Sequence, residues 1–209
     1  MLTRLRLTVP VVGILRGVEA DFFADLMQAS FDKGLEAIEV TMNTSGAEQM
    51  VAAQRPFVPE GKHLGMGTIR NLDEAERAVA AGAMFLVTPN LDQRVIGFAR
   101  ARGVPVIAGA LTPTEVYTAW SGGADMVKVF PCTALGGASY IRELRGPFEQ
   151  IPLVAVGGVT VDNLAAYFAA GAAAVGVSSS LFGKQALQAR DIDRLADNVR
   201  KFIACCPVT

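Results

Sequence analysis

The sequence predicts an α/β protein that folds as one compact (β/α)8 barrel over residues 1–209. Short apolar runs rich in β-branched residues occur eight times. Their starts lie about 20 to 27 residues apart, enough for one helix and two short loops. The runs are mostly apolar rather than alternating, which is typical of strands buried on both faces of a parallel sheet. Eight such units favour closure into a barrel, and an open doubly wound sheet is the alternative.

The expected strands follow one another along the whole chain. In order, they cover residues 10–15, 37–40, 63–67, 84–88, 105–111, 125–130, 152–158 and 173–177. The segments between them are predicted to be helical. In residues 19–34, apolar side chains recur at helical spacing and form one face. That face consists of Phe22, Phe23, Leu26, Met27, Ser30 and Phe31.

Local signals mark where several helices begin and end. Asn71 with Glu74 three residues later resembles a capping box, and so does Thr112 with Glu115, where Pro113 takes the first helical position. Glycines that can adopt the left-handed conformation end several helices just before the next strand. These glycines are Gly34, Gly82, Gly103, Gly123 and Gly171. Residues 202–209 are expected to end a last helix and continue as a tail.

Composition excludes several classes of protein. The chain is 51% hydrophobic and 19% charged, which excludes a disordered protein. A net charge of −1 without a basic tract gives no nucleic-acid footprint. No apolar run approaches the ~18–20 residues of a membrane span, and the start lacks the pattern of a secretory signal. The three cysteines have no metal-ligand spacing, so a cytoplasmic location is expected. The single histidine, His63, argues against sites with several histidine ligands.

Active groups of a barrel sit at the carboxyl ends of its strands, and Lys128 is the most informative residue there. Of five lysines, Lys128 is the one inside an apolar strand. Burial of an ammonium group lowers its pKa and makes the neutral amine available, and a neutral amine can attack a carbonyl to form a Schiff base. The alternative is a lysine that extends to solvent or pairs with a carboxylate.

Glu39 is a second charged residue inside an apolar strand. Burial raises the pKa of a carboxyl group, which suits general acid/base chemistry near neutral pH. The alternative is a plain ion pair between Glu39 and Lys128. Isolated buried charges on two different strands favour a functional site.

A phosphate site is expected after the last two strands. Barrels often bind phosphate there, and Gly157 and Gly158 would let backbone N–H groups approach an anion while Ser178 adds a hydroxyl. A tight turn is the alternative for the glycine pair. Arg16 could bind a carboxylate or lie on the surface, and Thr68 could donate to a carboxylate or cap a turn.

Three further residues have structural roles as alternatives or expectations. Pro89 could shape a pocket wall or simply end its strand. Cys132 neighbours the site but is expected to be a small packing residue. His63 is expected to be structural, because it begins a strand at the end of the barrel opposite the site.

Ordered motifs along residues 9–183 resemble a known family. They are Glu39-Val40-Thr41, Gly65-Met66-Gly67-Thr68, Thr88-Pro89-Asn90, Thr112-Pro113-Thr114-Glu115, Lys128-Val129-Phe130-Pro131, Gly136-Gly137 and Gly157-Gly158. Each motif is short, but the ordered set is specific. It resembles the class I aldolases that act on 2-keto-3-deoxy-6-phosphogluconate (KDPG) and related 2-keto acids.

The resemblance implies a small homotrimeric (β/α)8 barrel that needs no metal and no cofactor. It implies that Lys128 is the Schiff-base lysine and Glu39 the acid/base residue. Positions around the pyruvyl group are matched by Thr68, Pro89 and Phe130, and the phosphate region by Gly157, Gly158 and Ser178.

One position departs from the family pattern. Many members carry an arginine four residues after the glutamate, where this chain has Asn43. Together with the Ile14-Leu15-Arg16-Gly17 motif, Asn43 is more similar to the branch that cleaves the galactonate epimer (KDPGal). Arg16 could supply the missing guanidinium from the neighbouring strand. Asn43 is therefore expected to contribute to substrate binding, and the epimer stays open.

The predicted activity is reversible cleavage of KDPG to pyruvate and glyceraldehyde 3-phosphate. KDPGal and 4-hydroxy-2-oxoglutarate (KHG) are the alternative substrates. A phosphosugar isomerase or epimerase on the same barrel would also use Glu39 as a base, but it leaves Lys128 without a role. A metal-dependent epimerase is disfavoured by the single histidine. The alternative that is not an enzyme is a barrel that binds phosphorylated ligands without turnover.

Overall fold

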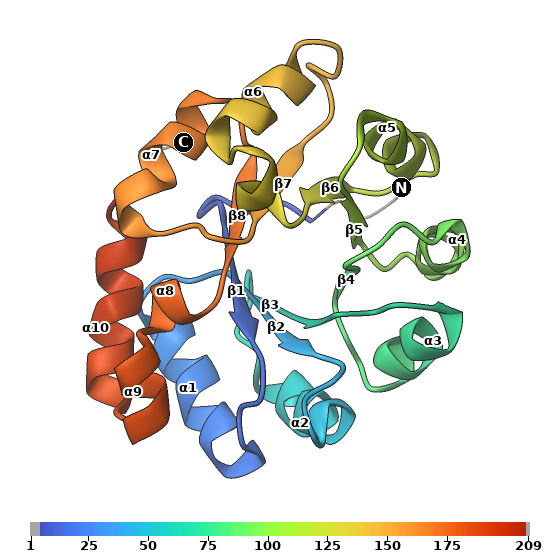
Figure 1. Cartoon of the computed structure of the whole chain (residues 1–209). Helices are drawn as coiled ribbons and strands as arrows, with labels where there is room; N and C mark the ends of the chain where they lie inside the picture. Colours follow the sequence, from blue (N-terminus) through green and yellow to red (C-terminus); the bar gives the residue numbers. More distant parts are fainter. Residues whose placement is uncertain (1–4, 208–209) are drawn as a thin grey trace.

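A computed structural model describes residues 5–207, in which eight parallel strands close into a barrel surrounded by helices (Figure 1). The strands pair in chain order, and β1 closes the barrel by pairing with β8. The predicted (β/α)8 fold is therefore confirmed, and the open sheet is excluded. Residues 1–4 and 208–209, at the ends of the expected domain and its C-terminal tail, lie outside the described residues.

The strands lie close to their predicted positions. They are β1 (Val11–Leu15), β2 (Ala37–Thr41), β3 (His63–Gly67), β4 (Leu86–Val87), β5 (Val106–Ala110), β6 (Met126–Val129), β7 (Leu153–Val156) and β8 (Ala174–Val177). The fourth is much shorter than the predicted run 84–88. It shares one residue pair with β3, Met66 with Leu86, and the Phe85 ring just before it packs against Gly65.

Helices follow every strand. They are α1 (Ala20–Asp32), α2 (Ala47–Gln54), α3 (Leu72–Ala80), α4 (Gln93–Arg102), α5 (Pro113–Ser121), α6 (Ala138–Arg145), α7 (Val161–Ala169), α8 (Ser179–Phe182), α9 (Lys184–Ala189) and α10 (Ile192–Ile203). Short 3-10 turns cover Arg55–Phe57 and Cys132–Leu135. The described part of the chain contains no helix with the length and apolar character of a membrane span.

The local signals of the sequence act largely as predicted. The predicted apolar face of α1 is buried in full, and all five helix-ending glycines have positive φ angles. Thr112 and Glu115 form the reciprocal capping box of α5. At α3 only half of the box forms: Asn71 accepts the Glu74 N–H at 3.0 Å, but the Glu74 carboxylate binds the N–H of Arg70 at 2.7 Å instead.

Side chains on alternate strand positions fill the barrel interior. Together with Leu5 from the segment before β1 and Phe85 just before β4, they form a small cluster of their own, separate from the larger core between strands and helices. Its buried members are Leu5, Val12, Ala37, Phe85, Val87, Ile107, Val154, Val156 and Ala174. Because strand side chains alternate with a period of two, Glu39 faces inward with Ala37. Lys128 likewise shares the inward face of β6 with Met126, which packs against this cluster.

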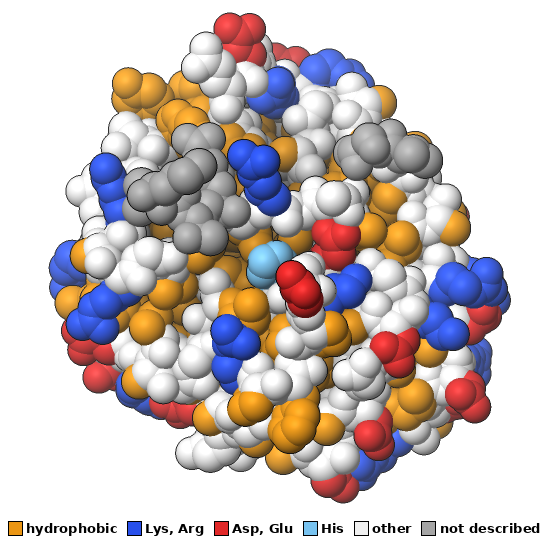
Figure 2. Space-filling model, turned by 180° about the vertical axis from the view of Figure 1, so that it is seen from behind, with side chains coloured by type: hydrophobic (Ala, Val, Ile, Leu, Met, Phe, Trp, Pro, Cys, Tyr) orange, Lys and Arg blue, Asp and Glu red, His pale blue; other side chains and the backbone are white. Residues whose placement is uncertain are grey.

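The end of the barrel at the amino ends of the strands carries the single histidine, pale blue in Figure 2. His63 begins β3, and its pKa is lowered chiefly by burial. It therefore lies at the end opposite the strand termini that carry the expected site.

Gly109→Ala is expected to destabilise the barrel by about 2–3 kcal/mol. A Cβ at Gly109 would lie 2.4 Å from the Pro89 carbonyl carbon and 2.6 Å from the Asn90 nitrogen, and backbone atoms cannot yield as a flexible side chain can. The matched control is Gly97→Ala in α4, where a Cβ meets nothing within 4 Å. This control should gain about 0.5–1 kcal/mol from helix propensity. Urea denaturation measures both, and equal effects would contradict the prediction.

Candidate active site

A cavity of about 250 Å³ opens at the carboxyl ends of the strands. Nine of the ten predicted site residues line it: Arg16, Glu39, Thr68, Pro89, Lys128, Phe130, Gly157, Gly158 and Ser178. Asn43 is the tenth and does not line the cavity. The fold therefore gathers into one cavity residues that the sequence spreads from β1 to the end of β8.

Glu39 reaches the cavity from a fully buried strand. The residue is 1% exposed, and its Oε2 atom has no hydrogen-bond partner among the described residues. Burial raises the pKa of Glu39 to about 7, against the opposing charges of Lys128 and Arg16. Oε2 makes no hydrogen bond to Lys128. With a pKa of about 7, the carboxyl group can exchange a proton near neutral pH.

A glycine on β3 makes room for this carboxyl group. A Cβ at Gly67 would lie 2.3 Å from Cδ of Glu39 and 2.4 Å from its Oε1. Any side chain at Gly67 would displace the carboxyl group. The Glu39 carboxyl group therefore requires glycine at position 67 for steric reasons.

Lys128 reaches the cavity from β6, four strands from β2 in the closed order and so across the barrel. It is 5% exposed, which rules out the alternative of a lysine that extends to solvent. Its pKa is lowered, first by burial and further by Arg16, while Glu39 opposes the shift. The Nζ atom lies 4.8 Å from the centroid of the Phe130 ring. The lowered pKa increases the fraction of neutral amine.

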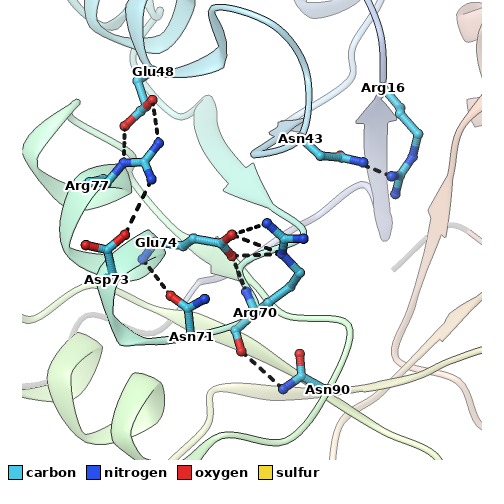
Figure 3. Close-up of polar contacts among 9 residues, drawn as sticks. All are labelled: Arg16, Asn43, Glu48, Arg70, Asn71, Asp73, Glu74, Arg77 and Asn90. Carbon is cyan, nitrogen blue, oxygen red and sulfur yellow. Dashed lines mark hydrogen bonds and ion pairs between the residues drawn. The ribbon is translucent and has the colours of Figure 1, made fainter.

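Arg16 joins three loops at the mouth of the cavity. Its Nη1 donates to Oδ1 of Asn43 at 3.1 Å, and its Nη2 donates to Oγ1 of Thr68 at 3.2 Å. Figure 3 shows Arg16 and Asn43 pointing toward each other from the ends of neighbouring strands. Thr68 has a φ of 57°, unusual for a residue other than glycine. Asn43 thus contacts the guanidinium rather than the cavity.

Two threonines at strand ends take part in contacts that hold loops and do not line the cavity. Thr41 shares a 2.9 Å hydrogen bond with Thr44, whose hydroxyl accepts the Gly17 N–H at 2.9 Å. Thr88 donates to the Asn90 carbonyl and accepts the Gly109 N–H, both at 2.7 Å. These contacts fix the loops that carry Arg16 and Pro89.

The glycine pair after β7 also lines the cavity. Gly157 and Gly158 have φ angles of 102° and 76°, which favour glycine. Ser178 lies beside them, and so do Ser179 and Ser180, which the sequence reasoning missed. The unbroken run of three serines after the last strand was the available signal. Cys132 is buried and does not line the cavity, which fits the predicted packing role.

These groups define a specific chemical environment. A buried amine, a carboxyl with a pKa of about 7 and a guanidinium group surround one small space. Such a site suits attack of an amine on a carbonyl carbon with proton transfer by a neighbouring carboxyl. The guanidinium and the glycine backbone each favour an anionic group.

Comparison with known proteins gives consistent matches over nearly the whole chain. The family model "KDPG and KHG aldolase" matches residues 2–198. The chain is 32% identical to 2-dehydro-3-deoxy-6-phosphogalactonate aldolase of Escherichia coli K12, over 93% of each chain. It is 36% identical to 2-dehydro-3-deoxy-phosphogluconate aldolase of Treponema pallidum, covering 80% of this chain and 78% of the relative.

A solved structure also resembles this fold. The structure described as native KDPGal superimposes with a TM-score of 0.89 at 31% identity, covering 97% of both chains. The relatives thus include proteins named for either sugar epimer.

Proposed function

Since the chain belongs to the KDPG and KHG aldolase family, we propose that it is a Schiff-base aldolase that reversibly cleaves KDPG into pyruvate and glyceraldehyde 3-phosphate. One observation carries the proposal: Lys128 and Glu39 are both buried at the floor of the same cavity, with pKa values displaced toward neutrality. An isomerase would use the carboxyl but would leave the buried lysine without a role.

The reaction begins at the lysine. The neutral amine of Lys128 adds to the C2 ketone of the substrate and forms a carbinolamine, which loses water to give an iminium ion. Glu39 supplies the proton that the departing hydroxyl needs and is left as a carboxylate. The positive iminium then acts as an electron sink beside the bond to be broken, which is why no metal is required in this proposal.

Cleavage follows from the same two residues. The Glu39 carboxylate removes the proton of the C4 hydroxyl, the C3–C4 bond breaks, and its electron pair moves into the iminium to form an enamine. Glyceraldehyde 3-phosphate leaves. Glu39 returns its proton to C3 of the enamine, and water hydrolyses the resulting iminium to release pyruvate and regenerate Lys128.

The remaining residues are assigned to binding. Arg16, held by Asn43, and Thr68 bind the substrate carboxylate, while Pro89 and Phe130 enclose the pyruvyl group. Gly157, Gly158 and Ser178 bind the phosphate. The hydrogen bonds of Arg16 support its assignment, because they place a guanidinium beside the Thr68 hydroxyl at the cavity mouth.

Borohydride trapping tests the proposed chemistry. Reduction in the presence of pyruvate should add a pyruvate-derived mass to the peptide that contains Lys128, because borohydride reduces the iminium to a stable secondary amine. Omission of pyruvate is the control. Absence of the adduct would exclude the Schiff-base mechanism.

Arg16→Met is expected to raise the KM for the 2-keto acid about 10- to 100-fold, since a charge-assisted hydrogen bond contributes about 1.5–3 kcal/mol. Arg16 also lowers the pKa of Glu39, so the acidic limb of the kcat profile should move to higher pH. Steady-state kinetics from pH 5.5 to 9 measure both effects. The exposed Arg102→Met variant is the control, and an unchanged KM would remove Arg16 from the carboxylate site.

KDPGal is the second candidate substrate, favoured by the Arg16–Asn43 contact and by the similarity to a relative named 2-dehydro-3-deoxy-6-phosphogalactonate aldolase. A coupled assay of pyruvate release from KDPG, KDPGal and KHG compares kcat/KM directly. A higher value for KDPGal would reassign the substrate without changing the chemistry.

The assembly and its requirements are also proposals. The family resemblance supports a homotrimer, which light scattering would detect at three times the 22.0 kDa chain mass. Activity should survive dialysis against a chelator, because the iminium of Lys128 provides the electron sink. A cytoplasmic location fits phosphorylated substrates and three free cysteines.

A further inference from the structure

The carbonyl groups of the two glycines in the cavity wall accept hydrogen bonds from side chains that lie outside the cavity. Thr133 donates its hydroxyl to the carbonyl oxygen of Gly157, and Nδ2 of Asn163 donates to the carbonyl oxygen of Gly158 at 2.8 Å. Neither Thr133 nor Asn163 lines the cavity, although both glycines do. Both carbonyl groups are therefore directed at side chains outside the substrate space.

The geometry of the peptide unit then determines where the neighbouring N–H groups point. In a trans peptide the C=O and the following N–H point in opposite directions. With its two carbonyl groups held back, the loop turns the N–H groups of Gly158 and Val159 toward the cavity wall that these residues form. Within residues 5–207, neither N–H donates to an acceptor. Two adjacent unused donors match an anion.

Further contacts orient the side chains of Asn163 and Thr133 toward the two glycines. The Oδ1 atom of Asn163 accepts the Thr160 N–H at 2.8 Å, so the amide is oriented with its donor on Gly158. A Cβ at Gly158 would lie 2.1 Å from Oγ1 of Thr133, so the hydroxyl fills the space that glycine leaves. Thr133 also lies five residues after Lys128, on the segment that leaves β6.

We propose that Thr133 and Asn163 are positioning residues that aim the Gly158 and Val159 N–H groups at the substrate phosphate, and so set the preference for phosphorylated over unphosphorylated aldehydes. The inference rests on the proposed function and adds to it two residues outside the cavity.

Condensation of pyruvate with an aldehyde separates this role from general stability. Thr133→Val removes the hydroxyl and keeps the shape, while Thr133→Ser keeps the hydroxyl. Asn163→Leu is neutral and of similar size. Thr118→Val is the matched control, because Thr118 donates to the Thr114 carbonyl at 2.6 Å in α5, away from the cavity. Each variant is assayed with glyceraldehyde 3-phosphate and with glyceraldehyde.

Thr133→Val and Asn163→Leu should raise the KM for glyceraldehyde 3-phosphate about 5- to 10-fold, the cost of one hydrogen bond. The KM for glyceraldehyde should change less than about twofold, since it lacks the phosphate. Thr133→Ser should restore the wild-type KM, and Thr118→Val should not alter it. Equal losses with both aldehydes, or no loss with the phosphorylated one, would overturn the proposal.

Calorimetry with inorganic phosphate gives a second readout that does not depend on turnover. Binding should weaken by the same factor in Thr133→Val and Asn163→Leu, and equal affinity in wild type and variants would overturn the positioning role. Failure of the proposed function would be visible separately, as a wild-type protein without a borohydride-trapped pyruvate adduct.

Discussion

Lys128→Met is expected to lower kcat for aldol cleavage by about 10⁴-fold or more and to abolish trapping by pyruvate and borohydride. Methionine has nearly the shape of lysine but no amine, so neither the carbinolamine nor the iminium can form. Without the iminium, the electron pair of the breaking C3–C4 bond has no acceptor. Initial rates of pyruvate release, coupled to its enzymatic reduction, measure the loss.

The matched control is Lys184→Met at the start of α9, which lines no part of this cavity and should retain wild-type activity. The folded structure of Lys128→Met should persist, because an apolar side chain replaces an ammonium group that burial disfavours. Circular dichroism tests whether the fold persists. Full cleavage activity in Lys128→Met would instead exclude the Schiff-base mechanism.

Glu39→Gln is expected to lower kcat by about 10²- to 10⁴-fold, the range typical of a lost general acid/base group. The amide retains the size of the side chain but cannot remove the C4 hydroxyl proton. Pyruvate trapping on Lys128 should continue, more slowly. This separates Glu39 from Lys128, whose replacement removes trapping altogether. Undiminished cleavage in Glu39→Gln would assign proton transfer to another group.

The pH dependence of kcat in the wild-type enzyme should reflect ionisation of the Glu39 carboxyl group. Iminium formation needs the protonated Glu39 carboxyl, which gives the kcat profile a basic limb. Cleavage needs the Glu39 carboxylate, so an acidic limb should appear in which kcat falls as the pH drops through about 7, the value to which burial raises its pKa. Glu39→Gln should lose this limb. A profile that is flat between pH 5.5 and 8 would contradict the assignment.

The free energy of unfolding should fall as the pH rises, which is opposite in sense to the acidic limb of kcat. The pKa of Glu39 is higher in the folded protein, about 7, than its ordinary value of 4.5. The folded state therefore binds the proton more tightly. Its contribution to the free energy of unfolding is full below about pH 4.5 and is lost as the pH rises through 7. The loss is about 3 kcal/mol, from 1.36 kcal/mol per pKa unit. Urea denaturation at pH 5 and 8 should show this fall in wild type and a smaller one in Glu39→Gln.

Several features of the fold and site could be predicted because their signals are local. Eight apolar runs at similar spacing specify a parallel (β/α)8 barrel, since each run must be buried on two faces and each intervening segment has room for one helix. The helix-ending glycines and the Thr112–Glu115 box depend on neighbouring residues alone. Lys128 and Glu39 are recognisable from the sequence because charges are rare in buried strands.

Other features depend on contacts between segments far apart in the chain. Phe85 packs its ring on Gly65 of a different strand, and the contact of Asn43 with Arg16 rather than the cavity follows from the meeting of two loops. The roles of Thr133 and Asn163 could not be inferred from the sequence, because the backbone they hold lies on a different loop or turns back to meet them.

The sequence by itself therefore determined the barrel, the two buried charges and the strand ends at which a site could form. Only the tertiary structure decided which of those residues share one cavity, and how far burial displaces their pKa values toward each other. The physical reason is that desolvation and steric fit depend on every atom packed around a group. Gly67, with no side chain of its own, leaves the space in which the Glu39 carboxyl is buried.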